Sequence, residues 1–207
     1  MRILGLKSIT IKKFNHSGNS KADNTKEYPN LLNQDFNANN PSEKWLGDIT
    51  YIYTKERGWT YLAVIIDLFD LKVIGWEYGI SMTEEISINA LKKAVVKRKP
   101  TDNMIFHSDR GSQYISNNFE TLLGNLNIKH SYSKKGYPYD NASMESFNAI
   151  LKKEEVNLHT YCSYEEAKLV IFEFIESWYN NIRIHSTLGY ITPNQKYNNY
   201  LASINAA

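Results

Sequence analysis

The stretch that decides the fold is His107-Ser108-Asp109-Arg110-Gly111-Ser112-Gln113-Tyr114. The short apolar run Met104-Ile105-Phe106 precedes it and predicts a buried strand, and Gly111 predicts a turn before a helical pattern. Asp109 therefore stands where a strand ends and the chain leaves a sheet. In open α/β sheets, active sites form outside the carboxyl ends of the strands. Asp109 is either a turn residue that accepts local N–H groups or part of a site with other acids.

The composition is that of a globular protein. Hydrophobic residues make up 42% and charged residues 22% of the 207 residues, which allows one large domain or one domain with appendages. The net charge of +2 argues only weakly for a polyanionic partner, so a nucleic-acid contact must come from local patches. The single cysteine, Cys162, excludes an intramolecular disulfide and a cysteine-based zinc site. No 18-residue apolar run or signal segment is present, so we expect a cytoplasmic protein with no membrane partner.

The hydrophobic patterns predict an α/β fold. Five strands are expected at residues 46–53, 59–67, 71–78, 104–109 and 128–132, the first three antiparallel. Helices are expected at residues 84–99, 119–126, 141–155 and 163–178. The basic run 97–99 is interpreted as a solvated helix end, which suits the helix dipole. Trp45 and Trp59 are assigned to the core.

Composition also divides the chain. Residues 1–40 form a basic, largely irregular N-terminal arm or linker, interpreted either as a disordered tail or as an arm that contacts DNA. Residues 41–200 hold the periodic elements and form the core, within which residues 179–193 predict a structured closing loop. Residues 201–207 are assigned as a tail.

The loop 133–141 interleaves basic, aromatic, Gly and Pro residues, in the order Ser-Lys-Lys-Gly-Tyr-Pro-Tyr-Asp-Asn. Such a mixture suits a loop that contacts a nucleic-acid backbone and stacks on bases, although an ordinary exposed loop would look the same. Lys134 and Lys135 are the candidates for phosphate contacts. Asp140 or Asn141 is expected to cap the helix that follows.

Three acids stand at the functional ends of predicted elements: Asp48 in the first strand, Asp109 at the end of the fourth, and Glu145 near the start of a helix. If the first and fourth strands are neighbours, the two Asp side chains can converge, and a helix packed across the sheet can bring Glu145 to them. Three carboxylates fit Mg²⁺ or Mn²⁺, and two such ions can hold the oxygens of an in-line phosphoryl displacement. Asn148 and Lys152 share the helix face of Glu145.

Other polar residues near these acids have alternative roles. Asp67 ends an apolar strand, so a local hydrogen-bonding role is preferred to metal ligation. His107 is interpreted as a packed, hydrogen-bonded histidine, with a role as a base as the alternative. Arg110 is expected to pair with a DNA phosphate or with Glu145.

Several longer motifs carry a resemblance to a known family. They are Trp45-Leu46-Gly47-Asp48-Ile49-Thr50-Tyr51-Ile52, residues 107–114, Asn141-Ala142-Ser143-Met144-Glu145-Ser146-Phe147-Asn148, residues 179–186 and residues 188–193. Thirty-five residues lie between Asp109 and Glu145, the spacing of a D,D-35-E signature. Over residues 31–197 the sequence resembles the catalytic half of bacterial insertion-sequence transposases of the DDE type, with the core of retroviral integrases.

The resemblance implies a ribonuclease-H-like fold, in which a mixed five-stranded sheet is flanked by helices. It implies a DNA transposase that cleaves DNA at transposon ends and joins the freed 3′-hydroxyl to target DNA. Asp48, Asp109 and Glu145 would be the catalytic residues and the ligands of two Mg²⁺ or Mn²⁺ ions. Lys152 would approach the DNA end, and Lys134, Lys135, Arg110 and Asn148 complete the candidate DNA contacts.

The resemblance also implies partners and a location. Relatives pair two transposon ends as multimers, so we expect self-association on DNA. Relatives carry upstream helix-turn-helix modules, often joined by frameshifting, so an upstream-frame protein or fusion is an expected partner. The location would be the bacterial cytoplasm, at the nucleoid. Two rival interpretations stay open: a related metal-dependent nuclease without strand transfer, and an inactive or truncated transposase remnant that only binds DNA.

Overall fold

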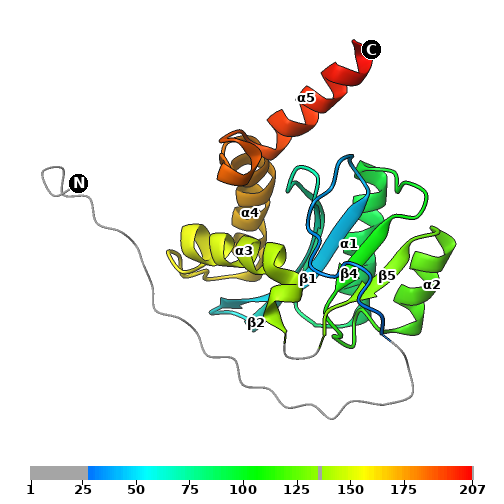
Figure 1. Ribbon diagram of the computed structural model, residues 1–207. Helices are drawn as coiled ribbons and strands as arrows, with labels where there is room; N and C mark the ends of the chain where they lie inside the picture. Colours follow the sequence, from blue (N-terminus) through cyan, green and yellow to red (C-terminus); the bar gives the residue numbers. More distant parts are fainter. Residues whose placement is uncertain (1–27, 135–136, 207) are drawn as a thin grey trace, which may run out of the picture.

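A computed structural model describes residues 28–134 and 137–206 of the chain. Its centre is a five-stranded sheet with the order β3-β2-β1-β4-β5 (Figure 1). The strands are β1 (Lys44–Thr54), β2 (Gly58–Asp67), β3 (Val73–Gly79), β4 (Ile105–Ser108) and β5 (Lys129–Tyr132). The first three strands are antiparallel, while β4 is parallel to both β1 and β5. This topology confirms the predicted mixed sheet of three antiparallel strands followed by two more.

Helices flank both faces of the sheet (Figure 1). The α-helices are α1 (Glu84–Lys97), α2 (Asn117–Asn125), α3 (Ala142–Leu151), α4 (Tyr164–Phe172) and α5 (Pro193–Asn205). Shorter segments are the 3₁₀ turns η2 (Pro138–Asn141) and η5 (Ser186–Leu188) and the π-helices η3 (Lys152–Val156) and η4 (Glu173–Tyr179). None of the helices described here is long and apolar enough to cross a membrane.

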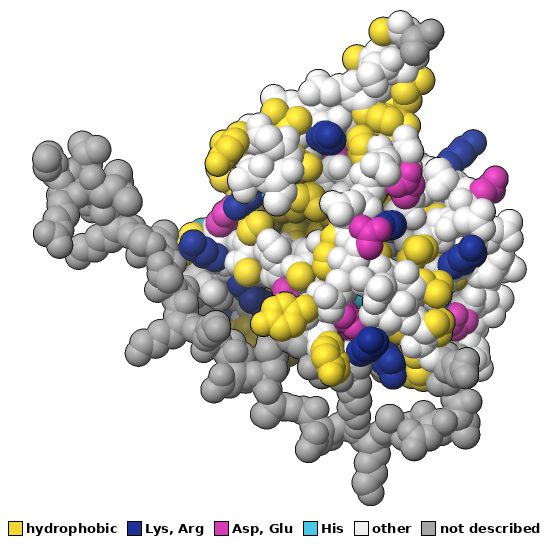
Figure 2. Space-filling view, viewed as in Figure 1, with side chains coloured by type: hydrophobic (Ala, Val, Ile, Leu, Met, Phe, Trp, Pro, Cys, Tyr) yellow, Lys and Arg dark blue, Asp and Glu magenta, His cyan; other side chains and the backbone are white. Residues whose placement is uncertain are grey.

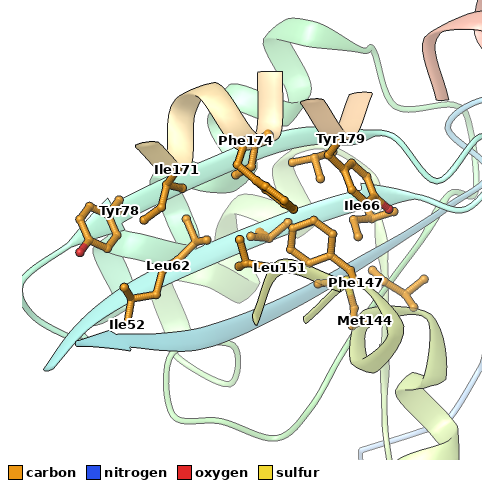
Figure 3. Packing of buried hydrophobic residues seen from close by; sticks show 14 of the residues in the cluster. Ile52, Leu62, Ile66, Tyr78, Met144, Phe147, Leu151, Ile171, Phe174 and Tyr179 are labelled. Atoms are coloured by element: carbon orange, nitrogen blue, oxygen red, sulfur yellow. The ribbon is translucent and has the colours of Figure 1, made fainter. Parts of the chain in front are cut away.

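The alternation of side chains along β1 builds a core on each face of the sheet, because successive residues of a strand point to opposite faces. Leu46 and Ile52 join the core under α3 and α4, whereas Trp45 joins the core under α1 and α2. Figure 3 shows the first of these cores, with Met144, Phe147, Leu151, Ile171 and Phe174 from the helical segments and Ile52, Leu62 and Ile66 from the strands.

Two glycines allow unusually close packing around the sheet. A Cβ atom on Gly75 would lie 2.3 Å from the carbonyl oxygen of Ala90, so α1 can rest on β3 only because Gly75 has no side chain. A Cβ atom on Gly47 would lie 2.5 Å from Cζ of Phe106. Gly47 therefore makes room for the ring of Phe106 next to β1, one residue before Asp48.

The predicted burial of one tryptophan is wrong. Trp45 is fully buried as expected, but Trp59 is 60% exposed. On that face of β2, α1 and α2 share their core with Ala63 and Ile65, whereas Trp59 lies further toward the hairpin turn and contacts Tyr53 edge-on. Trp59 was assigned to the core on its hydrophobicity alone, but the core under α1 and α2 does not extend to it.

The predicted solvated helix end after α1 holds for Lys97 and Lys99, which are exposed, but is wrong for Arg98, which is only 6% exposed. Its Nη1 atom donates to Asp67 Oδ2 at 2.6 Å and to Asp70 Oδ1 at 3.1 Å, and its Nη2 atom pairs with Asp70 Oδ2. Its guanidinium carbon lies 4.1 Å from the ring centroid of Tyr197 in α5. The buried cation therefore joins the end of α1, the β2–β3 turn and α5.

Asp67 has the local hydrogen-bonding role predicted for it. Its Oδ1 accepts from the backbone N–H of Phe69 at 3.0 Å, and its Oδ2 accepts from the backbone N–H of Ser42 at 2.8 Å. The Asp67 carboxylate thus accepts backbone N–H groups from the turn after β2 and from the segment just before β1.

Both predicted boundaries of the core domain differ from the structure. Residues before position 41 pack into the core, and the helix α5 continues past residue 200. Leu32 is 2% exposed in the core under α3 and α4, although residues 28–40 contain no helix or strand. The helix α5 begins after Thr192, whose side chain and that of Gln195 form a capping box. Residues 201–205, assigned as part of a tail, are therefore the last residues of this helix. The predicted character of residues 1–27 lies outside the described residues.

We predict that Arg98→Met destabilises the fold by about 3–5 kcal/mol, because it leaves two buried carboxylates without their cation. Urea unfolding would measure this change. The control is Lys97→Met, which removes a partly exposed ion pair with Glu176 and should cost no more than about 1 kcal/mol. Similar small losses for both variants would contradict the role given to Arg98.

Candidate active site

Asp48 and Asp109 occupy matching places on neighbouring parallel strands. β1 and β4 pair with Leu46 opposite His107, and Asp48 and Asp109 lie two residues further along each chain. Because side chains alternate with a period of two, this register sets both acids side by side where β4 ends. The charge of Asp109 raises the pKa of Asp48, as expected for neighbouring carboxylates.

Asp48 is held by helix α3. Asn148 Nδ2 donates a hydrogen bond of 2.6 Å to Asp48 Oδ2. Burial and the charge of Asp109 raise the pKa of Asp48 to about 7, against the opposing effects of the Asn148 hydrogen bond and the Lys152 charge. The carboxylate is therefore half-buried next to a like charge, an arrangement that costs stability unless a cation compensates it.

Asp109 stands in the turn that follows β4. The backbone N–H of Gly111 donates to Asp109 Oδ1 at 2.9 Å, and a Cβ atom on Gly111 would lie 3.0 Å from that oxygen. Surrounding protein atoms raise the pKa of Asp109. The hydrogen bond from Gly111 opposes this rise in the pKa, and Asp109 is exposed to solvent. Asp109 is thus both the turn residue and the partner of Asp48.

Glu145 lies in the first turn of α3, three residues before Asn148, and is exposed. Residues three apart share a helix face, so Glu145 lies on the side of α3 that faces the aspartates through Asn148. Over residues 28–134 and 137–206, no group of three His, Cys, Asp or Glu side chains is close enough to hold a metal ion. The structure brings Asp48, Asp109 and Asn148 together, and the set of three acids stays a prediction.

His107 is a packed histidine, as the sequence favoured. Its two ring nitrogens lie 2.8 Å from Ser131 Oγ and 3.0 Å from Ser133 Oγ. Burial lowers the pKa of His107 to about 4, so the ring is neutral at physiological pH. It joins β4 to β5 and the residue after β5 through the two serine hydroxyls.

The predicted DNA-contacting cations lie in different settings. Lys134 and Lys152 are exposed, and Lys135 lies outside the described residues. Arg110 Nε donates to the Ser133 carbonyl at 3.1 Å, and its guanidinium lies 5.3 Å from the ring centroid of Tyr28, so the predicted pair with Glu145 is replaced by these contacts. Figure 2 shows Lys and Arg side chains interspersed with Asp and Glu over the visible face.

Asp140 or Asn141 was expected to cap α3, and sequence reasoning missed the different role of Asp140. It is 2% exposed and accepts from Asn30 Nδ2 at 2.9 Å, Gln34 Nε2 at 2.8 Å and the Lys134 backbone N–H at 2.8 Å. Asn141 is the N-cap residue, without a side-chain cap bond. Asp140 therefore ties the start of Glu145's helix to the segment near residue 30, more than one hundred residues away in sequence.

The comparisons with known proteins agree with this geometry. One integrase core domain family matches residues 38–138 and a second matches residues 126–193. The transposase for insertion sequence element IS904 of Lactococcus lactis is 44% identical over 172 residues, which are 82% of this chain and 68% of the relative. Transposase InsF of insertion sequence IS3A of Escherichia coli is 42% identical over 202 residues, 98% of this chain and 69% of the relative. The chain belongs to the insertion-sequence transposase family.

Solved structures support the fold of this transposase. The catalytic core domain of HTLV-2 integrase, in complex with magnesium, aligns with a TM-score of 0.58 and 18% identity over 77% of this chain and 98% of that chain. An intasome of simian T-cell lymphotropic virus aligns with a TM-score of 0.55 and 21% identity over 70% of this chain and 50% of that chain. The predicted family, ribonuclease-H-like fold and class of nucleic-acid-cutting enzyme are confirmed.

We predict that Asp48→Asn stabilises the metal-free transposase at about pH 8 by roughly 1–3 kcal/mol, since one pKa unit is worth about 1.4 kcal/mol and the site is partly solvated. The folded chain keeps the Asp48 proton up to a pKa of about 7, whereas the unfolded chain loses it near its ordinary value. Wild-type stability therefore falls as the pH rises from about 4 to 7.

Denaturation at about pH 4 and 8 would measure the effect, and the variant's advantage should vanish at the lower pH. The amide oxygen that this substitution introduces can still accept the bond from Asn148, so the packing is kept. Asp102→Asn, at an exposed acid, is the control. An advantage of equal size at both pH values would contradict the assigned cause.

We also predict that Asp140→Ala costs about 2–4 kcal/mol in the free energy of unfolding, because it leaves a backbone N–H and two side-chain amides without their acceptor. Urea unfolding would measure it. Asp35→Ala is the matched control, since the Asp35 side chain is 60% exposed and pairs only with Lys44 among charged partners in the described chain. If both variants lose the same small amount, Asp140 does not anchor this region.

Proposed function

We propose that this chain is the catalytic part of a transposase that cleaves DNA at the ends of an insertion sequence and joins the freed 3′-hydroxyl to target DNA. The observation that carries the proposal is the pair Asp48, within β1, and Asp109, just after β4, which lie side by side on neighbouring strands in a chain of this family. Cleavage and joining are the same in-line displacement at phosphorus with different nucleophiles.

The aspartate pair fits divalent cations. Both side chains offer the oxygen ligands that Mg²⁺ and Mn²⁺ prefer, and their mutual repulsion is the kind that a bound cation relieves. We propose that Asp48 and Asp109, completed by Glu145, would hold two such ions. When bound, these ions would lower the pKa of the attacking water or 3′-hydroxyl and neutralise charge on the phosphate.

The remaining residues would position the acids and the DNA. Asn148 fixes the orientation of the Asp48 carboxylate through its hydrogen bond. Lys152 lies near enough to lower the pKa of Asp48, so its ammonium would meet a phosphate bound beside the aspartates. Lys134, Lys135 and Arg110 would contact the backbone further along the DNA.

The proposed partners are transposon ends, target DNA and further copies of this chain. The viral intasome and the trimeric HTLV-2 core are assemblies of more than one chain, and pairing of two DNA ends would require the same here. An upstream helix-turn-helix protein or fusion would supply recognition of the end sequence. The working location would be the bacterial cytoplasm, at the nucleoid.

The test uses the purified chain, Mg²⁺ or Mn²⁺, and labelled DNA that carries a pre-cut end of the insertion sequence. We expect joined products on a gel, and Asp109→Asn should reduce them by more than about a hundredfold, because even the outer partners of metal ligands are worth 10–100-fold. Asp102→Asn is the control and should leave the yield unchanged. Unchanged joining by Asp109→Asn would show that the enzymatic assignment is wrong.

The same assay separates the rival functions. Hydrolysis without joined products would support a metal-dependent nuclease. Binding without any cut or joined product would support a remnant that only binds DNA, an outcome favoured by the position of Glu145 outside the aspartate pair. Salt dependence of binding would not discriminate, because phosphate contacts are independent of sequence.

A further inference from the structure

Four aromatic side chains gather on one face of the β1–β2 hairpin. Tyr51 lies opposite Tyr61, and Tyr53 lies opposite Trp59. Both cross-strand pairs have ring centroids 5.4 Å apart, and the diagonal pair of Tyr51 and Trp59 is 6.4 Å apart, with all three contacts edge-on. We name these four residues the hairpin aromatic patch.

The patch is open to solvent although the opposite face of the same hairpin is buried. Tyr51, Tyr53 and Trp59 are 45%, 52% and 60% exposed, whereas Ile52 and Thr60 between them are fully buried. Figure 1 shows α3 and α4 over one side of the sheet, the side that covers Ile52. Cross-strand pairing explains why the rings touch, but not why three large rings stay in water. Each edge-on contact covers one face of one ring, and the exposed surface of Tyr51, Tyr53 and Trp59 is what remains for a further flat partner.

The position of the patch relates it to the aspartate pair. The pairing of β1 with β4 stops at Leu46, and β1 runs on past Asp48 toward Tyr51. The charges of Asp109 and Asp48 reach the Tyr51 hydroxyl and raise its pKa, after the larger effect of burial. Along β1 the patch therefore begins three residues after Asp48, and because side chains alternate, the Tyr51 ring lies on the opposite face of the strand from the Asp48 carboxylate.

The other end of the patch adjoins the hairpin turn, which carries two exposed cations. Lys55 and Arg57 flank Glu56, and Arg57 pairs with Glu56 at 3.1 Å. The turn therefore keeps one net positive charge beside the rings. A row of open aromatic faces between an acid pair and a basic turn is the combination that binds unpaired nucleotides, whose bases stack while their phosphates meet cations.

We propose that the hairpin aromatic patch is a stacking platform for unpaired bases of the DNA strand next to the aspartate pair. The proposal rests on the proposed function, since DNA must reach Asp48 and Asp109 for the strand to extend over the patch. A duplex hides its base faces, so the ligand is single-stranded or frayed DNA. Stacking does not read sequence, so the platform would serve transposon end and target alike.

The test compares two labelled duplexes, one with a short oligothymidine extension and one blunt, by fluorescence anisotropy at a single salt concentration. We expect the wild-type chain to prefer the extension. Loss of both rings in the double variant Tyr53→Ala, Trp59→Ala should reduce this preference about tenfold or more, the range of one or two stacked bases. Trp59→Phe should keep most of it. Phe172→Ala, at a 50% exposed ring of α4, is the matched control and should change nothing.

Two readouts guard against a misfolded variant. Trp59→Thr keeps a residue that favours strands and should show the same direction of loss, and thermal unfolding of each variant checks the hairpin. An unchanged preference in folded variants that lack the rings would overturn the proposal. A changed oligomeric state with an unchanged DNA preference, seen by sedimentation, would also overturn it and assign the patch to contact between copies.

Asp109→Asn separates this inference from the proposed function. That variant should lose DNA joining and keep the preference for the extension, because the rings are intact. If the wild-type chain joins DNA while the ring variants keep their preference, only the stacking platform fails. If the wild-type chain neither cuts nor joins DNA, the proposed function fails, and the anisotropy result still decides whether the patch binds unpaired bases.

Discussion

The parallel pairing of β1 with β4 is the constraint on which the site depends. It sets Leu46 opposite His107, and the acids two residues further along each chain follow from that register. A shift by one residue would turn one carboxylate to the opposite face of the sheet. Gly47 keeps the register possible, because any side chain there would strike the ring of Phe106.

Buried charges tie segments that are distant in sequence around this centre. Arg98 joins the end of α1 to Asp67 and Asp70, and Asp140 joins the start of α3 to Asn30 and Gln34. Each network satisfies polar groups that would otherwise be buried without partners. Removal of one member therefore costs more free energy of unfolding than the intact pair contributes. These contacts fix the ends of the helices, whereas the apolar cores fix their faces.

The functional centre is held in an unfavourable electrostatic state by the rest of the fold. Asp48 and Asp109 repel each other, and Asp48 keeps its proton up to a pKa of about 7. The surrounding cores supply the stability that this pairing costs. The hairpin aromatic patch also leaves three large rings exposed to water. Both features are unfavourable in the free chain, and both can be relieved by binding.

The sequence by itself determined the succession of the five strands along the chain, the position of Asp109 at a strand end and the spacing of the acids, because these depend on local periodicity and on motifs within short stretches. It also held the capping signal Thr192-Pro193-Asn194-Gln195, which predicts α5 once it is noticed. Only the tertiary structure decided that Arg98 is buried, that Trp59 is exposed and that Asn148 contacts Asp48. Periodicity shows which face of an element a residue occupies, whereas the packing of distant segments decides what covers that face.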